Sequence, residues 1–275
     1  MTAENHQTPG AAAPAPSIRP LTHDDELEQC VRLQREVWGD DFRELVPPAV
    51  LLVAQKVGGV ALGAFGPAGD LLGFVFGITG LRDDRPAHWS HMLAVRSDLR
   101  DRGVGRRLKE AQQAHLRALG VGMVYWTFDP LVSRNAHLNV HRLGASVIEY
   151  VRDMYGREST SPTTTVIGTD RFLVRWDIRE ARITPTVAWG ASIPALTLGR
   201  DAAVELPDAP ELLIEIPLDI QEVKARDPDR ARAWRRMTRA AFEHYLQRGY
   251  HVADFLRGAP GTSGRYLLRR EAAPR

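Results

Sequence analysis

The chain has 275 residues, of which 44% are hydrophobic and 25% are charged, and its formal net charge at pH 7 is +2. These values are ordinary for a soluble globular protein with one large domain or two small ones. Acidic residues nearly balance the basic ones, which argues against a protein that coats nucleic acid through a large positive charge. No apolar run is long enough to span a bilayer. The N-terminus lacks the pattern of a secretory signal. The single cysteine, Cys30, cannot form an internal disulfide, so we expect a cytoplasmic protein.

The first two thirds of the chain alternate predicted strands and helices. Residues 1–16 are rich in alanine, proline and polar residues and are predicted to form a disordered tail. Apolar runs and turn residues predict strands at 18–21, 60–65, 71–78, 90–95, 121–127, 147–151 and 172–178. Helical spacing and glycine stops predict helices at about 22–38, 104–119 and 133–143, the first with Thr22 as its N-cap. The pattern of the segment 47–59 fits either a helix or a strand.

Residues 179–275 are interpreted as a second, smaller α/β unit. An irregular stretch at 183–200 precedes a predicted strand at 212–217. Asp227 and Pro228 favour a helix start, and candidate strands follow at 250–256 and 265–268. The unit is too short for a large core of its own, so we expect it to pack on residues 17–178 or on a second subunit, which leaves a homodimer open.

The stretch Ser90–Arg107 is the most informative part of the chain for function. A predicted strand ends near Val95, and a basic loop leads directly into the helix that begins at Val104. The free N–H groups and the dipole of the first helical turn attract anions, and Gly103 and Gly105 let a phosphate approach the backbone closely. Four arginines add charge in a geometry that suits phosphate: Arg100, Arg102, Arg106 and Arg107. The alternative is a basic loop with two turn glycines.

Two common phosphate motifs do not fit this loop. Gly105 is followed by Arg-Arg instead of the Lys-Ser/Thr pair of a P-loop, and Leu108 stands where a dinucleotide-binding fingerprint needs its third glycine. The pattern Arg100-x-x-Gly103-x-Gly105 after a strand resembles the acetyl-CoA-binding signature of the GNAT superfamily of N-acyltransferases. Further motifs resemble one GNAT group of predicted acyltransferases in particular, some of which are associated with N-acylamino acid racemases and act as succinyl-CoA-dependent N-succinyltransferases on amino acids: Trp126–Leu131, Arg134–Ala136, Tyr155-Gly156 and Thr169–Arg171.

This resemblance covers roughly residues 18–178 and implies an α/β (α+β) fold with a mixed, twisted sheet flanked by helices. In GNAT proteins the two central parallel strands part, and the pantetheine arm of acyl-CoA pairs with the exposed backbone. Here those strands are 90–95 and 121–127. The residues implied in binding acetyl-CoA or succinyl-CoA are Leu93, Ala94, Val95, Arg100, Arg102, Gly103, Val104, Gly105, Arg106 and Asn135. An alternative for Asn135 is capping its helix.

The resemblance implies direct attack of an amine on the thioester, which requires a base. His91 is the first candidate, and alternation places it on the same face as Leu93 and Val95; the alternative is a histidine hydrogen-bonded inside the sheet. Asp129 is the second candidate base, and its alternative is a turn residue before Pro130. The tyrosine that many GNAT proteins use to protonate the leaving thiolate is replaced here by Val140.

Substitutes for this acid are Tyr155, Tyr150 or solvent. A carboxylate on the acceptor or on the acyl group would need an arginine, for which Arg171, Arg235 and Arg239 are candidates; structural ion pairs are the alternative. His88 and His91 form no metal set with a cysteine, so no metal is predicted.

The sequence thus predicts an N-acyltransferase that moves an acetyl or succinyl group from CoA to a small amine, with an amino acid as the expected acceptor. The alternatives are a non-catalytic acyl-CoA sensor, a protein N-acetyltransferase, and nucleic-acid binding through the arginines of 227–248, which a steep salt dependence would support. The expected partners are acyl-CoA and the amine, without nucleic acid or membrane.

Overall fold

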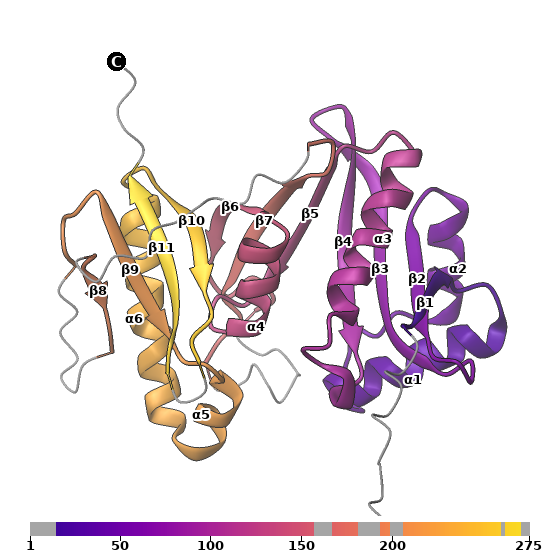
Figure 1. Cartoon of the computed structure of the whole chain (residues 1–275), viewed down its shortest axis with the longest axis horizontal. Helices are drawn as coiled ribbons and strands as arrows, with labels where there is room; N and C mark the ends of the chain where they lie inside the picture. The colour runs from indigo at the N-terminus through magenta and orange to yellow at the C-terminus, as the bar shows by residue number, and fades with distance from the viewer. Residues whose placement is uncertain (1–14, 157–166, 181–192, 199–205, 260–261, 271–275) are drawn as a thin grey trace, which may run out of the picture.

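A computed structural model of the chain describes residues 15–156, 167–180, 193–198, 206–259 and 262–270. Its strands form two sheets (Figure 1). The larger has seven strands in the order β1-β2-β3-β4-β5-β7-β6, and the smaller has four in the order β10-β11-β9-β8. All neighbours are antiparallel except the pairs β4–β5 and β8–β9. The predicted mixed sheet flanked by helices is confirmed.

The strands of the large sheet are β1 (Ser17–Pro20), β2 (Val60–Phe65), β3 (Leu71–Arg82), β4 (Arg85–Val95), β5 (Met123–Phe128), β6 (Ser146–Val151) and β7 (Arg171–Asp177). The helices between them are α1 (Asp24–Trp38), α2 (Pro48–Lys56), α3 (Val104–Ala118) and the short α4 (Ser133–Ala136), with a 3-10 turn at Ser97–Leu99. The second unit contains β8 (Ala195–Leu196), β9 (Glu211–Ile216), α5 (Ile220–Arg226), α6 (Pro228–Leu246), β10 (Tyr250–Leu256) and β11 (Gly264–Arg270).

The two helices near the N-terminus show how local residues decide an element. His23 is the N-cap of α1, which corrects the prediction of Thr22. The Glu26 carboxylate explains the shift, because it accepts hydrogen bonds from the backbone N–H of both Thr22 (2.9 Å) and His23 (3.3 Å). The segment left open between helix and strand is the helix α2, with Pro48 in its first turn, where the missing N–H costs nothing.

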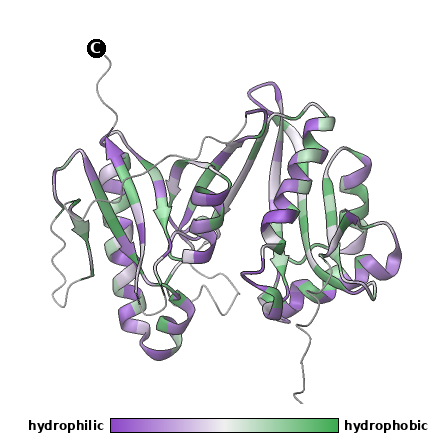
Figure 2. Cartoon of the chain, in the orientation of Figure 1, coloured by the Kyte–Doolittle hydropathy of each residue, from purple (hydrophilic) through white to green (hydrophobic). Residues whose placement is uncertain are grey.

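Apolar side chains cover both faces of the large sheet. On one face, α1 and α2 pack on a cluster that includes Phe74 and Phe76 of β3 and Met92 of β4. On the other face, α3 packs on a larger cluster that continues from the large sheet to α6 and the small sheet without a break. Figure 2 shows the hydrophilic and hydrophobic bands of α3 and α6, as expected for helices with one buried face. The C-terminal unit and the large sheet therefore share one core.

The C-terminal unit follows most of its predicted pattern. The Asp227 carboxylate accepts a hydrogen bond from the backbone N–H of Arg230 (2.9 Å), so the predicted helix cap is confirmed. Helix α5 was not predicted, because its seven residues are too few for a periodic pattern. Of the predicted irregular stretch 183–200, residues 193–198 are described and contain β8. The predicted tail lies, apart from Ala15 and Pro16, outside the described residues.

The predicted helix at 133–143 is one turn of α-helix followed by a π-helix, His137–Arg142. The backbone N–H of Leu143 donates to the carbonyl of Leu138 (2.9 Å), five residues earlier. The wider turn changes the direction of the side chains, and Asn139 faces the interior cavity described below while Val140 packs in the core. Hydrophobic spacing alone does not distinguish a π-turn from an α-turn, so the sequence did not reveal it.

In the ranges given above, no helix is both long and apolar enough to cross a membrane.

We predict that Gly77→Ala destabilises the protein, whereas Gly80→Ala on the same strand does not. A Cβ at Gly77 would lie 2.2 Å from His88 Nε2 and 2.5 Å from the Trp89 carbonyl oxygen, while nothing lies within 4 Å of one at Gly80. Overpacking of this kind costs about 1–3 kcal/mol. Urea unfolding of both variants measures the difference, and equal midpoints would contradict the packing described for β3 and β4.

Candidate active site

The strands β4 and β5 pair over only part of their length. Their parallel register joins Ala87 to Met123, His88 to Val124 and Trp89 to Tyr125, and then ends. Beyond Trp89, β4 stays paired with β3 as far as Val95, while β5 stays paired with β7, and the two strands part (Figure 1). Among the described residues, one edge of β4 at 90–95 therefore has no strand partner, and this is where the resemblance implied a gap.

A β-bulge at His91 accompanies the parting. On β3, Gly77 faces Ser90 and Phe76 faces Met92, so His91 is an extra residue on β4. A bulge of this kind bends a strand and reverses the faces that its later side chains occupy. Ser90 points to α3, whereas Met92 packs in the cluster under α1 and α2. The bent strand leaves room beside its free edge.

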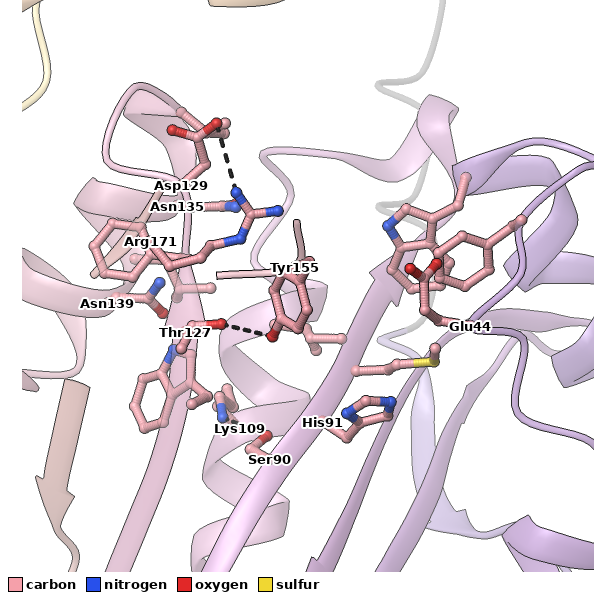
Figure 3. Close-up of a pocket in the computed structure, with 18 of the residues that line it drawn as sticks. Glu44, Ser90, His91, Lys109, Thr127, Asp129, Asn135, Asn139, Tyr155 and Arg171 are labelled. Atoms are coloured by element: carbon pink, nitrogen blue, oxygen red, sulfur yellow. Dashed lines mark hydrogen bonds and ion pairs between the residues drawn. The ribbon is translucent and has the colours of Figure 1, made fainter. Parts of the chain in front are cut away.

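A cavity of about 340 Å³ lies in this gap. Its walls come from β4, β5, α3, α4 and the segment after α1, together with side chains from β7 and the segment that follows β6 (Figure 3). The volume is near the lower end of the range for small-molecule sites, roughly 300–1,000 Å³. The predicted site residues that line the cavity are His91, Leu93, Asp129, Asn135 and Tyr155, and Arg171 lines it as well.

The basic loop leads to the start of α3 beside this gap. Gly103 is the N-cap of α3 with φ of 81°, a left-handed conformation that glycine adopts without strain, and as a glycine it has no side chain to cap the first turn. A Cβ at Gly105 would lie 3.7 Å from Val95 and 3.8 Å from Leu93, so the first turn of α3 adjoins the free edge of β4. Val104 is buried in the core and anchors this turn.

The side chains around the loop are mostly cationic. Arg100 and Arg102 are exposed, and Arg106 pairs with Glu110 at 2.7 Å. Burial, and after it the charge of nearby Arg100, lowers the pKa of Arg134 at the start of α4. Two like charges near the uncapped turn of α3 form a suitable place for a phosphate.

The structure corrects the orientation predicted for His91. Because the bulge reverses the alternation, Leu93 and Val95 pack toward α3. The His91 ring instead makes an edge-to-face contact with Phe76, on the face covered by α1 and α2, with the ring centres 6.1 Å apart. His91 nevertheless lines the cavity. Burial lowers the pKa of His91 below its usual value, and the carboxylate of Glu44, which also lines the cavity, offsets part of this.

Both oxygens of the Asp129 carboxylate have partners. Oδ1 accepts from the backbone N–H of Leu131 at 2.9 Å, and Oδ2 accepts from a guanidinium N–H of Arg235 at 2.7 Å. Asn135 lies inside α4, while the N-cap is Val132. The Asn135 side chain lines the cavity, so the capping alternative for this residue is wrong.

The two tyrosines considered as acids have different surroundings. The Tyr155 hydroxyl lies in the cavity, 3.0 Å from Thr127 Oγ1 (Figure 3). The Tyr150 hydroxyl donates to Asp170, and burial, together with that carboxylate, raises the pKa of Tyr150. Tyr150 does not line the cavity.

Lys109 is a cavity residue that sequence reasoning missed. It comes from α3, is 2% exposed, and its Nζ donates to Ser90 Oγ at 2.8 Å and to Gln112 Oε1 at 3.0 Å. The ammonium also lies 3.9 Å from the centre of the Trp126 ring. Burial lowers the pKa of Lys109 to about 7. None of the ion pairs in the described part of the chain includes Lys109, so a buried amine without a carboxylate partner lies where the two strands begin to part.

His88 extends this polar network. Its Nε2 lies 3.0 Å from the Gln112 amide nitrogen, and its Nδ1 lies 2.9 Å from Thr79 Oγ1. Burial, with the charge of Lys109, lowers the pKa of His88 to about 3, so the ring is neutral at pH 7. The signal for Lys109 was available in the sequence, because the chain uses arginine almost throughout and has lysine only at positions 56, 109 and 224.

No group of three or more His, Cys, Asp or Glu side chains within the described residues is arranged to hold a metal ion.

Comparison with known proteins gives structural likeness only. No protein-family model and no curated protein matches the sequence. Among solved structures, an aminoglycoside 6'-N-acetyltransferase complexed with coenzyme A is 14% identical, with 61% of this chain and 99% of that chain covered and a TM-score of 0.46. Naa20 from Chaetomium thermophilum with a bisubstrate analogue is 19% identical, with 59% and 87% covered and a TM-score of 0.47. The ribosomal-protein-S18-alanine N-acetyltransferase from Escherichia coli is 18% identical, with 62% and 99% covered and a TM-score of 0.45.

We predict that Lys109→Met removes a pH-dependent part of the stability. Since the folded-state pKa of Lys109 is about 7 and its ordinary value is 10.5, the unfolded chain binds one more proton between these values. Wild-type stability should therefore rise relative to Lys109→Met as pH increases from 7 to 10, by up to ~1.4 kcal/mol per pH unit.

Urea unfolding at pH 7, 8 and 9 measures this difference. Lys56→Met, at an exposed lysine of α2, is the matched control and should follow the wild type at every pH. A constant difference between wild type and Lys109→Met would mean that Lys109 remains charged in the folded protein.

Proposed function

We propose that the protein is an acyl-CoA-dependent N-acyltransferase and that acyl-CoA binds in the gap between β4 and β5. The observation that carries the proposal is the unpaired edge of β4 at residues 90–95, which adjoins the uncapped first turn of α3. An extended amide chain with a phosphate at one end matches both features, because amides pair with a free strand edge and phosphate suits a helix N-terminus. The pantetheine arm of CoA has this chemistry.

In this proposal the loop binds the phosphates of CoA and β4 binds the arm. The backbone N–H groups of Val104, Gly105 and Arg106 face the pyrophosphate, with Arg100 and Arg102 adding charge. The backbone of Leu93, Ala94 and Val95 pairs with the arm, and the amide of Asn135 bonds to it from α4. The thioester then lies in the cavity.

The proposed reaction is direct transfer to an amine. The amine nitrogen attacks the thioester carbon, the C–N bond forms, and the C–S bond breaks with its electrons on sulfur. His91 accepts the proton that the nitrogen loses. Burial lowers the pKa of His91, which favours the unprotonated ring that a general base needs. Tyr155 is the proposed donor of a proton to the thiolate, since its hydroxyl lies in the cavity and Val140 packs in the core.

Asp129 is assigned a different role from the base considered for it. Its two oxygens already accept hydrogen bonds from Leu131 and Arg235, so we propose that it positions the neighbouring arginines and takes no proton from the amine.

The finer identity of the substrates rests on the sequence resemblance. The expected acceptor is a small amine, an amino acid in the first place, and the acyl group is acetyl or succinyl. Membership of the N-acylamino acid racemase-associated group, a cytoplasmic setting and a homodimer remain predictions. The second candidate function is an acyl-CoA sensor without catalysis, which the absence of a tyrosine at position 140 favours.

We expect release of free CoA thiol from acetyl-CoA or succinyl-CoA to depend on an added amine, tested with a panel of L- and D-amino acids. His91→Ala should lower kcat by ~10²–10⁴-fold, the usual contribution of acid–base help, without a comparable change in the Kd of CoA. His251→Ala, at an exposed histidine of β10, is the control and should behave as the wild type.

Three other results are informative. Tight CoA binding without turnover on any amine would favour the sensor. Acceptance of peptides but not of free amino acids would favour a protein N-acetyltransferase. Failure of both CoA esters to bind would contradict the proposal itself.

A further inference from the structure

Beside one end of the cavity, several cationic side chains gather around one carboxylate that lines it. Arg171 from β7, Lys224 from α5 and Arg235 from α6 surround the carboxylate of Asp129, and we refer to these three side chains as the cationic end. Arg235 NH2 is 2.7 Å from Asp129 Oδ2, whereas Arg171 NH1 is 3.9 Å from the same oxygen. Burial lowers the pKa of Lys224, and the charge of Asp129 opposes this shift. All three cations therefore interact with Asp129, while the other carboxylate near Arg235, Asp170, is already hydrogen-bonded to Arg239.

Two of these cations bury nitrogen atoms for which the described part of the chain supplies no acceptor. Arg235 is 3% exposed and Lys224 is 8% exposed. Arg235 Nε donates to the Ile167 carbonyl at 3.2 Å, but Arg235 NH1 and Lys224 Nζ have no hydrogen-bond partner among the described residues. A buried cationic donor without an acceptor is costly, so this arrangement favours an additional anion nearby.

Arg171 is the member of the cationic end that reaches the cavity. Its side chain is 16% exposed, its NH1 donates to the Asp170 carbonyl at 3.0 Å, and its guanidinium lies 5.3 Å from the centre of the Tyr155 ring. Figure 3 shows it between Asp129 and Tyr155. No acceptor for its other nitrogens occurs in the described part of the chain. A guanidinium held in this way can bind a carboxylate with two parallel hydrogen bonds.

The three arginines considered from the sequence thus differ. Arg239 is engaged elsewhere, since its Nε and NH2 donate to the two oxygens of Asp170 and NH2 also donates to Asp153. Arg235 lies behind Asp129, outside the cavity. Arg171 alone of the three faces the space that a substrate would occupy.

We propose that the cationic end binds a carboxylate of the substrate, with Arg171 in direct contact and with Arg235 and Lys224 adding charge from behind. The inference rests on the proposed function and specifies the chemistry of its substrate. The carboxylate belongs either to the acceptor, as in an α-amino acid, or to a dicarboxylic acyl group on CoA. The C-terminal unit then contributes to substrate selection, since both supporting cations belong to it.

The test separates the two sources by removing each carboxylate in turn. Thiol release is measured with acetyl-CoA and succinyl-CoA, against amino acids and against the corresponding amino-acid amides. The enzymes are the wild type, Arg171→Met, Arg171→Lys, and Arg175→Met as a control at an exposed position of the same strand. Melting temperatures establish that each variant is folded.

We expect the wild type to prefer one carboxylate-bearing substrate over its neutral counterpart by roughly 30- to 1,000-fold in kcat/KM, the effect of truncating a buried charge pair. The preference should be expressed mainly in KM, should disappear in Arg171→Met, should be partly retained in Arg171→Lys, and should be unchanged in Arg175→Met. Preference for the amino acid over its amide assigns the carboxylate to the acceptor, and preference for succinyl-CoA over acetyl-CoA assigns it to the acyl group.

Three results would overturn the inference. Turnover of neutral and carboxylate-bearing substrates at equal kcat/KM would remove it and leave the proposed function intact, as would an unchanged preference in Arg171→Met. No turnover with any pair would contradict the proposed function, and the inference would fail with it.

Discussion

The structure depends on one constraint. Where β4 and β5 stop hydrogen-bonding to each other, each strand remains hydrogen-bonded to a different neighbour. β3 holds β4 as far as Val95, and β7 holds β5 as far as Phe128. Neither strand can close the gap without losing a full ladder of hydrogen bonds, so the free edge of β4 persists in the folded state. The backbone N–H and C=O groups along this free edge need hydrogen-bond partners. An extended ligand bound in the cavity can supply them.

Charge is distributed around this gap in a way that fits the same account. Arginine is the main source of positive charge in this chain, and two of its three lysines are buried. Lys109 lies where the strands begin to part, and Lys224 lies at the cationic end. A buried lysine loses its hydration, which lowers the pKa of both groups. Burying a charged group lowers the stability of the fold. Ionisable groups with strongly shifted pKa values are therefore found most often at functional sites.

The sequence predicted the order and approximate bounds of most strands and helices, because they follow from hydrophobic period, prolines and glycines. It also identified the loop at 100–107, whose glycines and arginines are local signals. It could not predict which way His91 points. Burial alternates without interruption from His88 to Ala94, and the bulge that exchanges the two faces depends on pairing with β3.

The π-turn at His137–Arg142 and the grouping of Arg171, Lys224 and Arg235 were hidden for the same kind of reason. The π-turn depends on backbone hydrogen bonding that side-chain pattern does not encode, and the three cations come from elements that only the tertiary fold brings together. The roles of His91, Tyr155 and the CoA-binding residues stay predictions.

The measurement that tests the central claim most directly is amide hydrogen exchange with and without CoA. If the arm of CoA pairs with the free edge of β4, peptides covering residues 90–95 and the first turn of α3 should gain protection, while β2, which is paired on both sides, should not change. Binding of CoA that protects another region and leaves residues 90–95 exchanging as before would contradict the account.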